Sequence, residues 1–383
     1  MKGLLSIPGI KACGIHCGIK KRRKDLSLIY SERKANWAGV FTKNKVKGAS
    51  ISFNKRRKNN EIQAILINSG NANTGTGAKG MRDVQKMAKI LAKSLNIPYN
   101  SVLIGGQTGK IGEFLPMEKI EAGIKRLVKR LPFGTNDDCI EGIMTTDKTK
   151  KEAEVDLGFC KIAGIAKGAG MIYPNMATML SFIATDARLD NKTLQEILKP
   201  CVDETFNRIS IDGCRSTNDS VIIMANGIAG RVDKNKFSKG LFFVCASLAR
   251  QIVEDGEGAT KLIRIVVEGA KTKKDVRNVA CSIANSPLVK AAMYGCDPNV
   301  GRILQAVGEA QASIEPKKIS IWLQGHLVAC CGATAFFDRE EIKQELNDKE
   351  IEIRVSLGKG KEAISFLTCD LSPEYVKINA AYS

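Results

Sequence analysis

The sequence predicts a mixed α/β fold, either α/β or α+β, built from layers of sheets and helices. Short runs rich in Val, Ile and Phe alternate with segments whose apolar residues have helical spacing, and Gly and Asn separate them along the chain. The 383 residues are 44% hydrophobic and 26% charged, which is typical of a globular protein with a core of its own. Strands and helices mixed in this way predict a mixed fold class.

Two helices are the clearest elements of the first half. Residues 81–95 (MRDVQKMAKILAKSL) place apolar residues at helical spacing with basic residues between them, and residues 118–131 form a second clear helix. Runs of β-branched and apolar residues predict the strands around these helices, at residues 26–30, 39–42, 64–68 and 101–104.

The second half alternates in the same way. It should contain a buried strand at residues 180–185 and helices at 192–199, 239–253, 300–308 and 339–346. Further strands are expected at residues 263–268, 320–323 and 351–356. No internal repeat or low-complexity linker marks a boundary between domains.

Composition argues against a membrane or secreted protein. No apolar run approaches the roughly 18 residues of a spanning helix, and residues 241–248 are the nearest candidate. Pro8 and Lys11 interrupt the apolar N-terminal stretch, and a basic run follows, which is unlike a signal peptide. The sequence therefore predicts a cytoplasmic protein.

Twelve cysteines are scattered without any C-x-x-C pair. Cys13, His16 and Cys17 resemble half of a zinc site, but a second half is missing, so buried reduced thiols are the better interpretation and no metal is predicted.

The positive charge is concentrated in the first hundred residues, which hold 21 Lys and Arg against 4 Asp and Glu. Two clusters, residues 20–24 and 55–58, could bind phosphate backbones. Neither is interleaved with aromatic residues, and no nucleic-acid-binding motif surrounds them. Nucleic-acid binding is therefore kept only as an alternative.

The glycine-rich motifs do not predict a nucleotide site. Gly75, Gly77 and Gly80 form a G-x-G-x-x-G, but the loop is long and the next strand ends in Gly-Gly without an acidic residue. The segment 105–110 (GGQTGK) is one residue short of a P-loop.

With only two histidines and no G-x-S-x-G elbow, an acyl-transfer enzyme would need another base. The amine of a new N-terminal Thr, Ser or Cys can serve, since its reference pKa is about 7.7 to 8.0.

Residues 167–187, KGAGMIYPNMATMLSFIATDA, closely resemble the signature of the ornithine acetyltransferase family, also called glutamate N-acetyltransferase, of arginine biosynthesis. The likeness covers nearly the whole chain. It includes AGVFTKNKVKGA (38–49), INSGNANTGTGAKG (67–80), GGQTGKIGEFLPM (105–117), IMTTD (143–147), STNDS (216–220), EDGEGATKLI (254–263), DPNVGRIL (297–304) and TCDLSPEYVKINA (368–380).

The resemblance implies an N-terminal-nucleophile enzyme of the ornithine acetyltransferase fold that cleaves itself between Ala177 and Thr178. The fragments 1–177 and 178–383 would form the alpha and beta chains of a heterotetramer, with a smaller C-terminal region whose boundary inside 178–383 stays open. Local chemistry agrees, because Ala177 is small and Pro174 favours a turn that could strain the bond.

The same resemblance assigns roles to other residues. Thr108 and Gly109 match the oxyanion-hole pair, on a Gly-rich turn expected after a strand. Lys167 would bind a substrate carboxylate and Glu257 a substrate amine, although an acid near a helix start is also explained by capping. The implied substrate contacts are Thr145 or Thr146, Lys167, Thr178, Glu257, Asn379 and Ser383.

Some positions depart from the family pattern. The chain ends at Ser383, one position before the usual hydroxyl residue, while Cys214, Arg215 and Val300 replace common family residues. These changes bear on substrate preference more than on cleavage.

The resemblance implies acetyl transfer from N2-acetylornithine to glutamate through acetyl-Thr178, without a metal or organic cofactor, and with acetyl-CoA as a second donor in some members. One alternative is a related N-terminal-nucleophile aminopeptidase, which would hydrolyse its acyl intermediate. The other is a basic nucleic-acid-binding protein.

Overall fold

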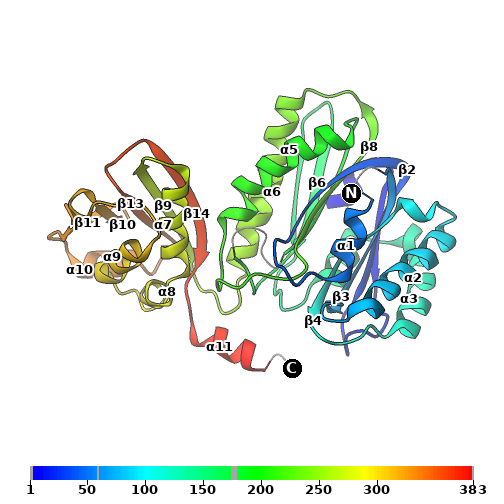
Figure 1. The fold of residues 1–383 in the computed structure, drawn as a ribbon, viewed down its shortest axis with the longest axis horizontal. Helices are drawn as coiled ribbons and strands as arrows, with labels where there is room; N and C mark the ends of the chain where they lie inside the picture. The colour runs from blue at the N-terminus through cyan, green and yellow to red at the C-terminus, as the bar shows by residue number, and fades with distance from the viewer. Residues whose placement is uncertain (1–2, 58–59, 174–178, 382–383) are drawn as a thin grey trace. The chain divides into compact units, whose positions relative to one another are not determined.

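The computed structural model describes residues 3–57, 60–173 and 179–381. The chain divides into two compact units. The first unit is Met1–Met171, Asn175–Asn207 and Cys214–Ile252, and the second is Ile172–Pro174, Arg208–Gly213 and Val253–Ser383 (Figure 1). Strands and helices are mixed in both units, which confirms the predicted fold class.

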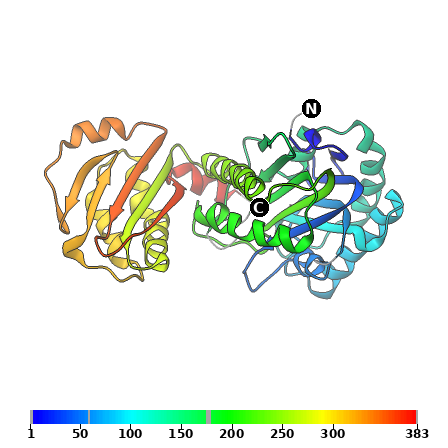
Figure 2. The ribbon, with the colours of Figure 1, turned by 90° about the horizontal axis from the view of Figure 1, so that it is seen from above.

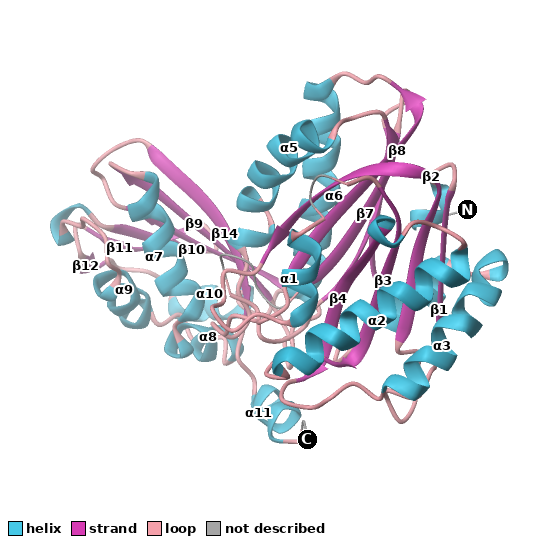
Figure 3. Ribbon diagram, turned by 45° about the vertical axis from the view of Figure 1, so that its right-hand side comes forward, coloured by secondary structure: helices cyan, strands magenta, loops and turns pink. Residues whose placement is uncertain are grey.

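The described residues of the first unit form one eight-stranded sheet, with the order β4-β3-β2-β8-β7-β6-β5 and β1 paired to β2 (Figure 3). Its strands are β1 Ile10–Ile15, β2 Leu26–Phe41, β3 Ile62–Asn71, β4 Val102–Lys110, β5 Lys151–Asp156, β6 Lys161–Lys167, β7 Leu180–Ala187 and β8 Ser220–Gly230.

The long strand β2 joins the two halves of this sheet. Its first part pairs with β1 and β3, and its second part pairs with β8. The sequence predicted two separate strands at 26–30 and 39–42, which is wrong, because the polar residues between them continue the same strand. One strand therefore carries the chain from one half of the sheet to the other.

Helices cover the sheet and complete the layers. Apolar residues of α2 (Gly77–Leu95) and α3 (Met117–Arg130) pack with β3 and β4 in one core. A second core contains side chains of β3 and β4 together with β6, β7 and β8, so the two halves of the sheet face each other across it. The other helices are α1 Ala49–Lys55, α4 Asn136–Ile143, α5 Asn191–Glu204 and α6 Lys234–Glu254.

The described residues of the second unit form a six-stranded sheet with the order β12-β11-β10-β13-β9-β14 (Figure 2). Helices α7, α8 and α9 contribute to its core. The elements are β9 Leu262–Ala270, α7 Lys273–Asn285, α8 Pro287–Tyr294, α9 Val300–Glu309, β10 Ser320–Leu323, β11 His326–Cys330, β12 Ala333–Thr334, α10 Arg339–Glu345, β13 Glu350–Ser356, β14 Glu362–Cys369 and α11 Pro373–Ala380. This unit is the smaller C-terminal region that the sequence predicted.

Two further findings bear on the sequence predictions. Across the described ranges, no helix is both long and apolar enough to cross a membrane. All twelve cysteines lie in these ranges as free thiols, and seven of them are buried, as expected of reduced side chains.

Candidate active site

The predicted site residues are distributed over both units, and three of them are not among the residues that the structure describes. Ala177, Thr178 and Ser383 lie outside the described residues. The first unit holds Thr108, Gly109, Thr145, Thr146 and Lys167, and the second unit holds Glu257 and Asn379.

Thr108 lies inside a strand and not in the turn that the sequence predicted. Strand β4 does not end at residue 104 but continues to Lys110, and Thr108 pairs with Ser69 of β3. The strand continues because Gly105 and Gly106 fit under the facing layer. A Cβ at Gly105 would lie 2.7 Å from a ring carbon of Phe182, in β7. The Gly-Gly pair is thus required for packing and does not mark the end of the strand.

Gly109 has a backbone that only glycine adopts easily. Its φ is +127°, and a Cβ there would lie 2.3 Å from the carbonyl carbon of Gly70 on β3. Any side chain at this position would therefore push β3 and β4 apart next to Thr108.

The structure brings Thr108 and Lys167 close together. Lys167 ends β6, and its Nζ lies 3.5 Å from Thr108 Oγ1. Both residues are buried, with exposed fractions of 6% for Thr108 and 3% for Lys167. The site thus offers a hydroxyl and an ammonium within hydrogen-bond distance of each other, shielded from bulk water.

A buried carboxylate that the sequence analysis missed, Asp147, supports this lysine. Its Oδ2 lies 3.9 Å from Lys167 Nζ and accepts a hydrogen bond of 2.9 Å from the backbone N–H of Thr145. Its Oδ1 accepts bonds from the N–H of Gly168 at 2.7 Å and from Lys151 Nζ at 2.9 Å. Asp147 therefore connects the chain around Thr145 to the end of β6.

Asp147 is held in its charged form. Burial alone would raise the pKa of this carboxyl, but the ammonium groups of Lys167 and Lys151 and the N–H groups of Thr145 and Gly168 lower it well below its usual range. Thr145 and Thr146 are both partly buried. Their burial therefore does not distinguish which of them contacts the substrate.

A second buried aspartate of this unit has a pKa shifted in the opposite direction. Asp219 immediately precedes β8, and its Oδ1 accepts a hydrogen bond of 3.2 Å from the N–H of Met179. Burial raises the pKa of Asp219 well above its usual range. The N–H of Met179, the hydroxyls of Thr42 and Ser216 and the charge of Lys167 lower it, but they compensate only in part. Asp219 lies in the STNDS segment of the family likeness, and its sequence context predicts no role for it.

The Asn-rich and Gly-rich segment after β3 serves as a scaffold for Thr108. Gln107 donates from Nε2 to Asn68 Oδ1 at 2.9 Å, and Asn73 donates from Nδ2 to Gln107 Oε1 at 3.0 Å. A Cβ at Gly80 would lie 2.0 Å from Thr76 Oγ1 and collide with this network. Gly80 is therefore required by packing against buried polar side chains, whereas Gly75 and Gly77 are favoured by their positive φ angles of +74° and +57°.

In the second unit the structure brings Glu257 and Asn379 together. Asn379 on α11 donates from Nδ2 to Glu257 Oε2 at 2.8 Å. The capping interpretation of Glu257 is wrong, because this residue lies in a turn beyond the end of α6 and no helix begins there among the described residues. Its buried carboxylate accepts a hydrogen bond from a neighbouring side chain instead.

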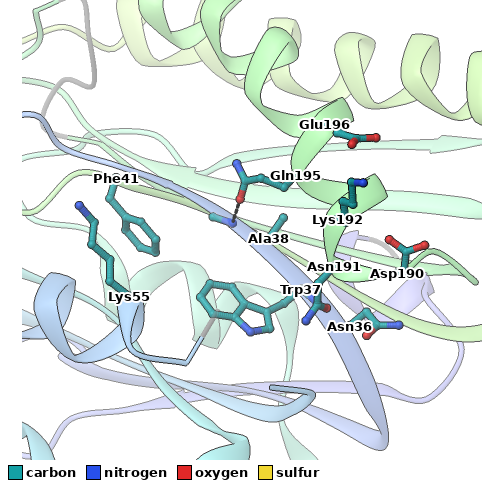
Figure 4. Close-up of a pocket in the computed structure, with 11 residues that line it drawn as sticks. Asn36, Trp37, Ala38, Phe41, Lys55, Asp190, Asn191, Lys192, Gln195 and Glu196 are labelled. Atoms are coloured by element: carbon teal, nitrogen blue, oxygen red, sulfur yellow. Dashed lines mark hydrogen bonds between the residues drawn. The ribbon is translucent and has the colours of Figure 1, made fainter. Parts of the chain in front are cut away.

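Other clusters in the described segments contain none of the predicted site residues. A cavity of about 1000 Å³ lies along β2 beside α5, where Gln195 accepts a hydrogen bond from the N–H of Gly39 (Figure 4). In the second unit, one ring nitrogen of His326 lies 3.1 Å from Glu345 and the other 3.9 Å from Glu341, and such a group could hold a metal ion.

The basic clusters are partly used inside the fold. Lys20 donates to the carbonyl of Met144 at 3.0 Å, and Lys24 pairs with Asp138 at 2.6 Å. Arg57 is buried, with its guanidinium 3.6 Å from the ring centre of Phe53. These three cations stabilise the first unit and do not form a continuous exposed stripe.

Three comparisons with known proteins agree with one another. The model of the ArgJ family matches residues 11–383. The chain is 45% identical over 399 residues to "Arginine biosynthesis bifunctional protein ArgJ" of Caldanaerobacter subterraneus subsp. tengcongensis, covering 100% of this chain and 99% of that protein. It is 43% identical to the protein of the same name from Listeria monocytogenes, with the same coverage. A crystal structure of the Bacillus halodurans protein is 38% identical, with a TM-score of 0.50, and covers 51% of this chain and 96% of that chain.

Proposed function

Because the chain belongs to the ArgJ family, we propose that it transfers an acetyl group from N2-acetylornithine to glutamate through an acetyl-Thr178 intermediate. The observation that carries this proposal is the pair formed by Thr108 and Lys167, whose polar atoms lie 3.5 Å apart in a buried site. The identity of 45% and 43% to arginine biosynthesis proteins over the whole chain supports the substrate class.

The reaction follows from the chemistry of these groups. The free amine of Thr178 takes the proton of its own hydroxyl, and the hydroxyl oxygen attacks the acetyl amide of acetylornithine. The Thr108 hydroxyl and the Gly109 N–H stabilise the oxyanion of the tetrahedral intermediate, and ornithine leaves with the proton. The amine of glutamate then attacks the acetyl ester of Thr178, which regenerates the enzyme.

The charged residues would orient the substrates. Lys167 pairs with a substrate carboxylate, and its burial strengthens that pairing relative to water. Glu257 pairs with the substrate's free amine, while Asn379 holds the Glu257 carboxylate through its hydrogen bond of 2.8 Å. Thr145 or Thr146 and Ser383 supply further hydroxyl contacts.

Self-cleavage between Ala177 and Thr178 provides the reactive amine. The Bacillus halodurans chain is matched over 96% of its own length although it covers only 51% of this chain, so it has about the length of one cleavage fragment. This supports an enzyme of two different chains, which we propose assemble as a heterotetramer in the cytoplasm. Neither a metal nor an organic cofactor takes part in the proposed steps.

The curated relatives are named bifunctional, which supports acetyl-CoA as a second donor. We therefore include the synthesis of N-acetylglutamate from acetyl-CoA in the proposed function. A related aminopeptidase would instead release free amino acids from peptide amides. Acetylation of added glutamate distinguishes the acetyltransferase from the aminopeptidase.

The test combines intact mass with a donor and acceptor screen. Wild-type protein should appear as fragments 1–177 and 178–383, and Thr178→Ala as one uncleaved chain without activity. Acetylornithine and acetyl-CoA should each acetylate glutamate, whereas peptide amides should not be hydrolysed. An uncleaved wild type that still transfers acetyl groups would exclude the terminal amine as the base, and peptide hydrolysis without transfer would favour the aminopeptidase.

A further inference from the structure

A buried amide, Asn218, lies beside the strand that carries Thr108. Asn218 precedes β8 and is 3% exposed. Its Nδ2 donates to the carbonyl of Ala72 at 2.5 Å and to the carbonyl of Gln107 at 2.6 Å. Its Oδ1 accepts from the hydroxyls of Thr74 at 2.7 Å and Thr217 at 2.8 Å.

These four bonds use the full capacity of the side chain. A primary amide has two N–H donors and one oxygen with two lone pairs, and every one of them is engaged here. The orientation of the amide is also determined, because Nδ2 faces two carbonyls and Oδ1 faces two hydroxyls. Space around it is limited, since a Cβ at Gly48 would lie 2.3 Å from Asn218 Oδ1. Asn218 is therefore held rigidly.

The carbonyl of Gln107 belongs to the peptide group that leads into Thr108. Because Asn218 holds this carbonyl, it fixes the plane of the peptide and with it the direction in which the Thr108 side chain leaves the backbone. Asn68 and Asn73 hold the side chain of Gln107, but Asn218 holds its main chain.

We propose that Asn218 is a positioning residue for the oxyanion hole, acting by fixing the Gln107–Thr108 peptide so that the Thr108 hydroxyl and the Gly109 N–H point at one place. This inference rests on the proposed function, because it takes Thr108 and Gly109 as the oxyanion donors. It assigns Asn218 no contact with substrate. Its effect should therefore appear in turnover and not in substrate affinity.

Removal of the amide should lower kcat by about tenfold to hundredfold, since displacement of a donor by about 1 Å can cost on the order of a hundredfold. The KM for acetylornithine should change by less than about twofold, because Lys167 and Glu257 are left in place. A general loss of folding would instead lower the amount of active enzyme.

The structure offers a matched control in Asn54, which lies on α1 and bonds to the same strand. Asn54 is fully buried and bonds to the main chain of β4 at Ile104, donating from Nδ2 to its carbonyl at 2.6 Å and accepting from its N–H at 3.1 Å. Asn54→Ala removes the same kind of amide contact to this strand, at Ile104, four residues before Thr108. It should reduce thermal stability to a similar degree and leave kcat within about twofold.

The experiment measures kcat and KM in cleaved wild type, Asn218→Ala and Asn54→Ala, with acetylornithine and glutamate. Thr74→Val, which removes one of the two hydroxyls that hold the amide, replaces Asn218→Ala if that variant does not fold, and should show a smaller fall in kcat. The double variant Asn218→Ala/Thr108→Ala should be slower than Thr108→Ala by less than Asn218→Ala is slower than wild type, because the part of the Asn218 effect that acts through the Thr108 hydroxyl is already lost.

The outcomes separate this inference from the proposed function. Absence of acetyl transfer in cleaved wild type would defeat the proposed function itself. Active wild type with equal losses of kcat in Asn218→Ala and Asn54→Ala would overturn only the positioning role, as would additive effects of Asn218→Ala and Thr108→Ala. A selective fall in kcat for Asn218→Ala would support it.

Discussion

Asp147→Asn should destabilise the first unit strongly, because it removes a buried negative charge from two buried lysines. The aspartate contacts Lys151 at 2.9 Å and lies 3.9 Å from Lys167, and its oxygens also accept two backbone N–H groups. Whichever oxygen becomes an amide NH2 then faces a backbone N–H and an ammonium. Removing one partner of a buried ion pair typically costs about 3 to 5 kcal/mol. In a domain of this size the loss corresponds to a fall in melting temperature of about 6 to 20 °C.

The pH dependence of this loss has a definite sign. The folded-state pKa of Asp147 is lowered, so its contribution to the free energy of unfolding is present above the ordinary carboxyl pKa of 3.8 and is lost as pH falls toward the folded-state value. The stability difference between wild type and Asp147→Asn should therefore be largest near neutral pH. It should shrink below about pH 4 as the unfolded chain becomes protonated.

Urea unfolding at pH 7 and pH 3.5 measures both effects. Replacing Trp322 by Phe leaves Trp37 as the single tryptophan, which is buried in the first unit and reports on its unfolding. A Thr178→Ala background keeps one chain throughout. Asp156→Asn is the matched control, because Asp156 is an exposed carboxylate 3.5 Å from Lys161, a pair that contributes little. Equal losses for the two substitutions would refute the buried-charge argument.

Two further predictions concern the same unit. Asp219→Asn should leave stability unchanged near pH 3 and raise it increasingly above the ordinary carboxyl pKa. The raised folded-state pKa of Asp219 makes ionisation of this buried group costly as pH rises. Urea titrations of both proteins across pH 3 to 8 measure the stability difference. If Asp219 were charged in the folded protein, this difference would not increase with pH. Gly109→Ala should abolish soluble, active enzyme because the new Cβ would collide with β3. The control is Gly308→Ala on α9. Nothing lies within 4 Å of a Cβ at that position, so this substitution should raise the melting temperature slightly. Normal expression and turnover of Gly109→Ala would contradict the close packing of β3 and β4.

The elements with strong local patterns could be predicted from the sequence. The helix expected at residues 81–95 is the core of α2, and the strand expected at 263–268 lies within β9, because amphipathic spacing and β-branched runs reflect burial directly. The end of β4 was misjudged for the opposite reason. Gly105 and Gly106 resemble a turn locally, and side chains far away in the sequence explain their place in a strand. These are Ile65 and Phe182 at Gly105 and Leu180 at Gly106.

The same distinction applies to the site. Thr108 and Lys167 were assigned by resemblance, and the structure shows that they meet. Asp147 and Asn218 were missed, although both lie in segments that the family likeness had already marked. Their roles depend on partners far along the chain, such as Ala72 and Gln107 for Asn218, and no local spacing records such contacts. An aspartate or asparagine next to threonines is read from sequence as a turn or a cap.

The two buried aspartates differ because of what surrounds each carboxyl, and the difference gives the site a fixed charge pattern. Asp147 has two lysines and two backbone donors and stays ionised, whereas Asp219 has one backbone donor, that of Met179, and is held toward its neutral form. Lys167 lowers the pKa of both carboxyls, and its ammonium lies 3.9 Å from Oδ2 of Asp147. Asp147 therefore holds the ammonium of Lys167, while burial disfavours a negative charge on Asp219 beside Met179. The raised pKa of Asp219 lowers its repulsion of an anionic group that approaches Lys167, which favours binding of an amino-acid carboxylate.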